Sequence, residues 1–201
     1  IVFRQKAKHQ RKMKIAVLAL QGAFIEHERM LEKLGAECFE VRQLADWQQP
    51  KDALVIPGGE STTQLKLLKD LALLEPVREY IEHGGAVFGT CAGLILLSKH
   101  VQGEEFDRIS TMNTEVCRNA YGRQLGSFYA EAEMNGVGVV PMTFIRAPYI
   151  KSVEAPAEAL AVVDGHIVAA RQGRQLVTAF HPELNEDTRV HEYFLREIVG
   201  K

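Results

Sequence analysis

Residues 86–97 read AVFGTCAGLILL. A short apolar run reaches the turn Gly89-Thr90-Cys91-Ala92-Gly93, and an apolar helical pattern follows at once. Because glycines let a backbone turn sharply without a Cβ clash, the turn predicts a strand-to-helix corner with Cys91 at the end of a sheet. The first N–H groups of the following helix would favour a thiolate there. Taken alone, the pattern also fits a buried cysteine in a glycine-rich turn.

Strands and helices alternate in the chain before this corner. Near-continuous apolar runs predict strands that are buried on both faces of a sheet, and amphipathic patterns predict helices between them. Such alternation forms right-handed βαβ units, so we expect an α/β fold with a mainly parallel central sheet and helices on both faces. The expected strands are Lys14–Leu20, Glu37–Arg42, Ala53–Ile56 and the run from Ala86, and the expected helices are Phe24–Leu34, one from about Thr62 with Ser61 and Gln64 as a capping box, and one from Pro76 to Gly84-Gly85.

Three short segments follow predicted strands of this sheet. Ligands of parallel sheets bind beyond the carboxyl ends of the strands, where these segments lie. We therefore expect Gln21-Gly22, Pro57–Ser61 and Gly89–Gly93 to surround one site.

The pattern changes after Ser98, where strands are expected to follow one another with turns between them. Asp164-Gly165 is a typical hairpin turn. No repeat, low-complexity tract or linker interrupts the chain, so we expect a single domain over residues 13–201. The expected strands are Thr111–Arg118, Gln124–Glu133, Val139–Arg146, Ala159–Val163, His166–Ala170 and Gln175–Phe180, and a closing helix is expected over Asp187–Val199.

The distribution of charge separates a basic tail from an acidic body. Residues 1–12 contain five Lys or Arg and no acid, whereas residues 13–201 contain 19 basic and 26 acidic residues. An acidic body argues against nucleic acid as the main partner. The tail itself could be a translated upstream segment, a remnant of cloning or a nucleic-acid-binding arm.

The three cysteines are far apart and show no zinc-binding spacing, which favours a reducing cytoplasm. The apolar run Ile15–Leu20 is too short to span a membrane, so no membrane association is expected. We also expect no metal and no cofactor.

A possible base and its orienting acid follow the last predicted strand. In an extended segment His181 and Glu183 would point to the same side, at the sheet edge where Cys91 is expected. A thiol beside a base that a carboxylate orients is the arrangement of nucleophilic cysteine catalysis. Without Cys91 nearby, the tripeptide would be an edge histidine and a solvated glutamate.

The segment Pro57-Gly58-Gly59-Glu60-Ser61 allows three interpretations. It lacks the Lys of a P-loop and the spacing of a dinucleotide motif, which weakens phosphate binding. Its backbone N–H groups could instead form an oxyanion hole with the N–H of Ala92. It could also be a plain turn before a helix cap.

Six motifs in order resemble the glutaminase subunits of pyridoxal 5′-phosphate synthase, a family of triad-type (class I) glutamine amidotransferases. The resemblance begins at Met13, and it implies a three-layer, flavodoxin-like α/β fold. The motifs are Leu18-Ala19-Leu20-Gln21-Gly22, Pro57-Gly58-Gly59-Glu60-Ser61-Thr62, Gly89-Thr90-Cys91-Ala92-Gly93, Arg118-Asn119-Ala120-Tyr121-Gly122-Arg123-Gln124, Phe144-Ile145-Arg146-Ala147-Pro148 and Phe180-His181-Pro182-Glu183.

The resemblance implies hydrolysis of L-glutamine to glutamate and ammonia for vitamin B6 synthesis. Cys91 would be the nucleophile, with His181 and Glu183 as its catalytic partners. The protein partner would be the synthase subunit, which receives the ammonia, and Gln21 is a candidate for a partner-facing residue, although it could merely satisfy strand-end backbone groups. The implied glutamine-binding residues are Gly59, Glu60, Ser61, Arg118, Ile145 and Arg146, with Gly59 and Ala92 forming the oxyanion hole.

Other functions remain open at this point. The glutaminase of another synthase, such as imidazole glycerol phosphate synthase, would carry the same triad. A non-catalytic glutamine-sensing scaffold or a redox sensor built on Cys91 would belong to a different class. An α/β-hydrolase is disfavoured because the chain is short and no separate acid lies between the nucleophile and the histidine.

Overall fold

The computed structural model describes residues 11–118 and 126–200. A parallel sheet forms its centre, in the strand order β2-β1-β3-β4-β12. The strands are β1 (Lys14–Leu18), β2 (Glu37–Val41), β3 (Ala53–Ile56), β4 (Ala86–Thr90) and β12 (Gln175–Thr178). β3, β4 and β12 are buried along their whole length, as expected for strands that are covered on both faces.

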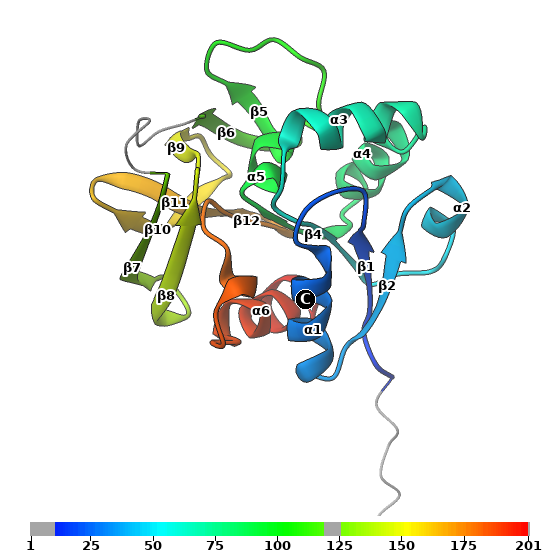
Figure 1. The fold of residues 1–201 in the computed structure, drawn as a ribbon, viewed down its shortest axis with the longest axis horizontal. Helices are drawn as coiled ribbons and strands as arrows, with labels where there is room; N and C mark the ends of the chain where they lie inside the picture. Colours follow the sequence, from blue (N-terminus) through cyan, green and yellow to red (C-terminus); the bar gives the residue numbers. More distant parts are fainter. Residues whose placement is uncertain (1–10, 119–125, 201) are drawn as a thin grey trace, which may run out of the picture.

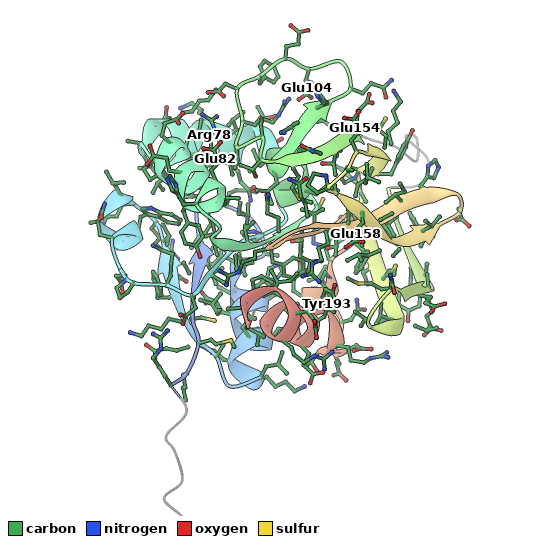
Figure 2. The ribbon with its side chains drawn as sticks, turned by 180° about the vertical axis from the view of Figure 1, so that it is seen from behind. Arg78, Glu82, Glu104, Glu154, Glu158 and Tyr193 are labelled. Carbon is green, nitrogen blue, oxygen red and sulfur yellow. The ribbon has the colours of Figure 1, made fainter. Side chains whose placement is uncertain are left out.

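Helices cover both faces of this sheet (Figure 1). α1 (Phe24–Lys33) and α6 (Arg189–Tyr193) lie on one face, and α3 (Ser61–Asp70), α4 (Leu74–Glu82) and α5 (Ala92–Leu97) lie on the other. Tyr193 of α6, seen from behind in Figure 2, is buried, and its hydroxyl accepts a hydrogen bond from Arg171 (3.1 Å). The expected three-layer α/β fold is therefore confirmed.

Beyond β12 the sheet continues with antiparallel strands, in the order β11-β10-β7-β8. Asp164-Gly165 joins β10 to β11, as the sequence predicts. The strands of this part are β5 (Ser98–Val101), β6 (Met112–Cys117), β7 (Ser127–Met134), β8 (Gly138–Ile145), β9 (Tyr149–Val153), β10 (Glu158–Val163) and β11 (His166–Gln172).

Several predicted bounds need correction. The strand expected at Gln175–Phe180 ends at Thr178, and the closing helix divides into α6 and the π-helical turn η2 (Phe194–Val199). The short helix α2 (Leu44–Trp47) and the strands β5 and β9 were not predicted. The first two residues of the strand expected over Gln124–Glu133 lie outside the described residues.

The predicted capping box of α3 is wrong. Ser61 is already the first helical residue, and the carboxylate of Glu60 accepts the backbone N–H groups of Thr62 (3.0 Å) and Thr63 (2.7 Å). Desolvation opposes the charge, but these hydrogen bonds outweigh it and lower the pKa of Glu60 to about 2. An anionic Glu60 thus holds the N-terminus of α3 and fixes the end of the glycine segment before it.

No helix within residues 11–118 and 126–200 is long and apolar enough to cross a bilayer.

Candidate active site

Cys91 lies at the corner between β4 and α5, as the sequence predicts. Its backbone adopts φ +49° and ψ −97°, a strained conformation for a residue with a Cβ. The backbone N–H of Cys91 donates to the carbonyl of Thr178 on β12 (2.8 Å), which holds the corner against the neighbouring strand. A Cβ on Gly93 would overlap the carbonyl oxygen of Ile56, so only glycine allows α5 to approach β3 this closely.

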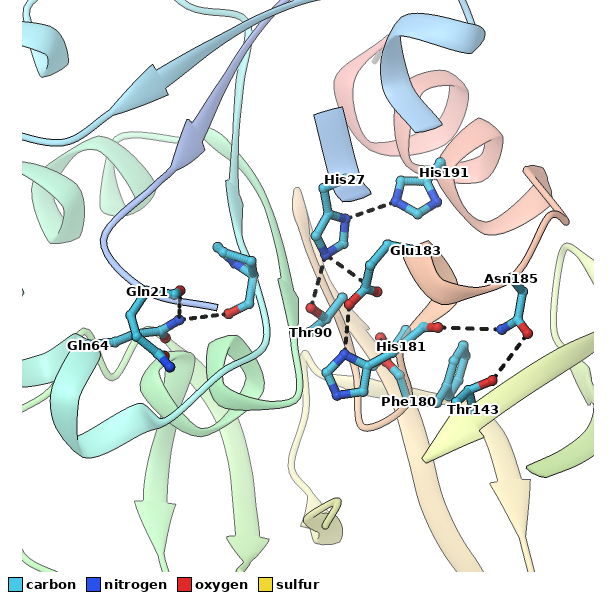
Figure 3. A network of polar contacts seen from close by, with 12 residues as sticks. Gln21, His27, Gln64, Thr90, Thr143, Phe180, His181, Glu183, Asn185 and His191 are labelled. Atoms are coloured by element: carbon cyan, nitrogen blue, oxygen red, sulfur yellow. Dashed lines mark hydrogen bonds and ion pairs between the residues drawn. The ribbon is translucent and has the colours of Figure 1, made fainter. Parts of the chain in front are cut away.

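His181 and Glu183 follow β12, the strand that pairs with β4. Both side chains are buried, and His181 Nδ1 lies 2.7 Å from Glu183 Oε1 (Figure 3). Because β4 and β12 are parallel, the residues after both strands reach the same edge of the sheet. The prediction that they share this edge is confirmed, but its reason was wrong. Glu183 is not in an extended segment; it lies in the 3₁₀ turn η1 (Pro182–Leu184), which folds the carboxylate back onto the imidazole.

The imidazole of His181 is held in its charged form. Burial favours the neutral ring, but side-chain hydrogen bonds to Cys91 and Glu183 and the negative charge of Glu183 raise the pKa of His181 to about 10. Burial alone would raise the pKa of Glu183, yet the hydrogen bond and positive charge of His181 lower it. A cationic imidazole that contacts the Cys91 side chain can protonate a leaving nitrogen.

The raised pKa of His181 predicts a loss of stability in alkaline solution. Protonation stabilises the fold fully below the ordinary value of 6.5, and the contribution disappears as pH rises toward about 10. Relative to His181→Gln, the free energy of unfolding of the native protein should therefore fall across this interval. Urea titrations at several pH values measure the difference. Parallel curves for the two proteins would contradict the charged imidazole.

The three carboxyl-end segments meet at one site, as predicted. The N–H of Ala23 donates to the carbonyl of Gly58 (3.1 Å), and a Cβ on Gly22 would overlap that same carbonyl. A Cβ on Gly58 would overlap the ring of His181. The glycine segment therefore packs directly on the imidazole, beside the corner that holds Cys91.

Gln21 secures the glycine segment. Its Oε1 accepts the backbone N–H of Glu60 (2.7 Å), and a Cβ on Gly59 would overlap this oxygen. The buried Gln64 donates through Nε2 to the carbonyls of Gln21 (3.0 Å) and Pro57 (3.1 Å). The alternative that Gln21 satisfies strand-end backbone groups thus describes its contacts here, and its partner-facing role stays a prediction.

Two of the predicted glutamine-binding residues contact each other. The guanidinium Nη2 of Arg118 donates to the hydroxyl of Ser61, which is buried at the start of α3. Arg118 Nε also forms an ion pair with Glu104 Oε1 (3.0 Å), and Glu104 in turn pairs with Arg108 (2.5 Å). Arg118 therefore bridges the glycine segment and the β5–β6 connection. Residues 119–124 of its motif lie outside the described residues.

Ile145 and Arg146 lie at the end of β8, the strand beside His181. The N–H of His181 donates to the carbonyl of Thr143 on β8 (2.8 Å), two residues before Ile145. Ile145 is 41% exposed, so it is not the core residue that its side chain alone would suggest. Arg146 is exposed, has φ +43°, and forms no ion pair with another described residue. Among the described residues, no hydrogen bond or ion pair joins either side chain to Cys91 or His181.

Three polar residues behind Glu183 were missed by sequence reasoning. His27, Thr90 and His191 are completely buried; His27 lies 3.5 Å from the carboxylate and contacts the other two. His27 lies on the same face of α1 as Met30 and Leu31, which are also buried. A histidine on an otherwise apolar helix face was the available signal. No group of three or more His, Cys, Asp or Glu in the described part of the chain is placed to hold a metal ion.

Two curated relatives match nearly the whole chain. Pyridoxal 5′-phosphate synthase subunit PdxT of Methanocorpusculum labreanum is 57% identical over 188 residues, which cover 94% of this chain and 99% of the relative. The PdxT protein of Streptococcus pneumoniae CGSP14 is 56% identical over 186 residues, with 91% and 96% covered.

Solved structures show the same fold. A crystal structure titled glutamine amidotransferase superposes with a TM-score of 0.87 at 44% identity and covers 93% of this chain and 99% of its own. A glutamine amidotransferase from Thermotoga maritima, at 13% identity, has a TM-score of 0.62 and covers 94% of this chain and 84% of its own, which shows the fold alone. The profile of the SNO glutamine amidotransferase family matches residues 17–200. With this match and these relatives, the chain belongs to the SNO glutamine amidotransferase family.

Proposed function

We propose that this chain is the glutaminase component of a pyridoxal 5′-phosphate synthase. It hydrolyses L-glutamine to L-glutamate and ammonia and delivers the ammonia to a partner synthase subunit for vitamin B6 synthesis. The relatives named PdxT, which cover nearly the whole chain, support the pathway. The glutaminase domain extends over residues 13–201, and the protein acts in the cytoplasm.

One observation carries the proposed chemistry. The nucleophile corner at Cys91 and the His181–Glu183 pair lie at the ends of two adjacent parallel strands. The charge on His181 depends on its hydrogen bonds to Cys91 and Glu183. A thiol, a base and an orienting carboxylate in this order make a catalytic triad.

The reaction has two steps. The Cys91 thiolate attacks the side-chain carboxamide carbon of glutamine, the C–N bond breaks, and His181 gives its proton to the nitrogen, which leaves as ammonia. His181 then takes a proton from water, the hydroxide attacks the thioester, and glutamate leaves as the thiolate is restored. The backbone N–H groups of Gly59 and Ala92 stabilise the oxyanion in both steps.

Glutamine is recognised by charge as well as by shape. Its α-carboxylate needs cationic or N–H donors, and its α-amino group needs an acceptor. Arg118 and the exposed Arg146 supply positive charge, Glu60 supplies a carboxylate, and the backbone at Ile145 lines the pocket. Ser61 orients Arg118 through the hydrogen bond between them.

Ammonia is useful only when a second protein receives it. The synthase subunit docks over the edge of the sheet that carries Cys91, and Gln21 faces it. The contact between Gln21 and the N–H of Glu60 supports a role in transmitting docking, because Glu60 adjoins the oxyanion donor Gly59.

Glutamate release with and without the synthase subunit tests this function. Release should be weak for the isolated chain and should rise on adding the pyridoxal phosphate synthase subunit. The synthase component of imidazole glycerol phosphate synthase serves as the control and should not raise it. No release from the complex, or equal stimulation by the control, would contradict the proposed function.

A further inference from the structure

A buried polar chain extends from Glu183 into the interior of the molecule (Figure 3). His27 Nε2 lies 3.5 Å from Glu183 Oε2 and 3.1 Å from the hydroxyl of Thr90, the residue before the nucleophile. His27 Nδ1 lies 2.9 Å from His191 Nε2. His27, Thr90 and His191 are completely buried, and they come from α1, β4 and α6.

The negative charge of Glu183 favours one arrangement of protons. Glu183 Oε2 is a buried carboxylate oxygen without a hydrogen bond in the described structure, and its negative charge favours an N–H over a lone pair on His27 Nε2, 3.5 Å away, which can donate to Thr90. His27 therefore carries its proton on Nε2, and Nδ1 accepts from His191 Nε2–H. His191 Nδ1 is then a bare lone pair, in agreement with its lack of a hydrogen-bond partner among the described residues. The opposite tautomers would leave a buried N–H of His191 unpaired and set two lone pairs against each other at Glu183.

Both histidines are neutral in this arrangement. Burial lowers the pKa of His27, and burial together with the neighbouring His27 lowers the pKa of His191 well below its ordinary value. The charged or titratable groups around His27 are Glu183 on η1, His181 after β12, Glu26 on α1 and His191 on α6. Because a neutral His27 does not cancel the negative charge of Glu183, that charge can still stabilise the cationic ring of His181.

We propose that His27 is a positioning residue, which holds the second oxygen of Glu183 so that the first can orient His181. His191 fixes the tautomer of His27, and the triad thus becomes a chain of four side chains from Cys91 to His27 with His191 behind it. The inference rests on the proposed glutaminase function. Groups that orient the ligands of a metal ion typically contribute about 10- to 100-fold to activity, and we expect an effect of the same order from His27.

A matched pair of amide variants tests the role of His27. The amide nitrogen of Gln can occupy the position of His Nε2, whereas the shorter Asn reaches only the position of Nδ1. His27→Gln should therefore keep the contact to Glu183, and His27→Asn should keep only the contact to His191. In the complex with the synthase subunit, we expect His27→Asn to lower kcat about 10-fold or more, with KM for glutamine within about twofold, and His27→Gln to retain most of kcat.

The pH profile separates positioning from a structural role. Without its donor, the pKa of Glu183 rises, so the acid limb of kcat/KM for His27→Asn should move to higher pH. Two outcomes would overturn the inference. One is an equal kcat for both variants. The other is a kcat that falls only in proportion to the fraction of unfolded protein, while the acid limb of kcat/KM stays at its native pH.

Nitrogen NMR of the histidine rings in the native protein provides a measurement without substitution. We expect His27 and His191 both to be neutral and protonated on Nε2 at pH 7, and a proton on His27 Nδ1 would overturn the inference. Failure of the proposed function is recognised separately: the native complex would release no glutamate, or Cys91→Ala would release as much as the native protein. In that case the inference falls with it, whatever the ring tautomers are.

Discussion

Cys91→Ala should abolish glutamate release by the complex with the synthase subunit. The substitution removes the sulfur that forms the thioester in the proposed reaction, and the remaining groups can then only bind glutamine and polarise it. Loss of a nucleophile that acts together with its base commonly lowers kcat by about 10⁴- to 10⁶-fold. Glutamate release under saturating glutamine measures the effect.

Cys38→Ala is the matched control for this substitution. Cys38 is a half-buried thiol on β2, and burial, with the nearby Glu32 and Glu28, raises its pKa to about 12, so it stays protonated and inert. We expect native rates from this variant, and a glutamine-like electrophile should label it as fully as the native protein. Substantial turnover by Cys91→Ala would rule out the thioester.

Gly58→Ala should have the second largest effect. The added Cβ would overlap the ring of His181, so the imidazole must shift away from Cys91 or from Glu183. A displacement of about 1 Å at a catalytic group can lower the rate about 100-fold. We expect kcat to fall by about this factor while the secondary structure, measured by circular dichroism, stays unchanged.

Gly165→Ala separates this effect from a general loss of stability. Gly165 has φ +80° in the β10–β11 turn, and a Cβ added there would meet no atom within 4 Å beyond its chain neighbours. An alanine there costs about 1–2 kcal/mol of backbone strain but leaves the imidazole in place. Both variants should therefore unfold at a lower urea concentration than the native protein, but only Gly58→Ala should have a lower kcat. Native kcat for Gly58→Ala would show that the packing of this segment does not position His181.

The central sheet could be predicted because its strands are buried on both faces. The predicted bounds of Ala53–Ile56 agree with β3, where all four residues are buried and apolar. β5 and β9 carry no such signal: Lys99 and His100 in β5 are exposed, and only Ile150 is buried in β9. In these two strands the side chains do not alternate between solvent and core, so the sequence lacks the period-2 pattern that predicts a half-buried strand.

The candidate site was predicted as a set of residues but not as a network. Residues that follow parallel strands lie at the same edge of the sheet, so Cys91 and His181 could be placed together without the strand order. The cap at Glu60 was missed because Glu is uncommon at that position and Ser61 fits the usual pattern better. His27 was missed because its partners come from β4, η1 and α6, and only packing of the helices brings them together.

The place of β12 in the sheet has a consequence for biosynthesis. β12 is the last strand of the described chain, yet it lies between β4 and β11, in the middle of the sheet. During translation, Cys91 is made directly after β4. Thr178, whose carbonyl holds the Cys91 corner, and His181 are made about ninety residues later. Inserting a central strand last requires long-range contacts, which form slowly. In the proposed mechanism, glutamine hydrolysis therefore begins only when the two halves of the sheet have closed around β12.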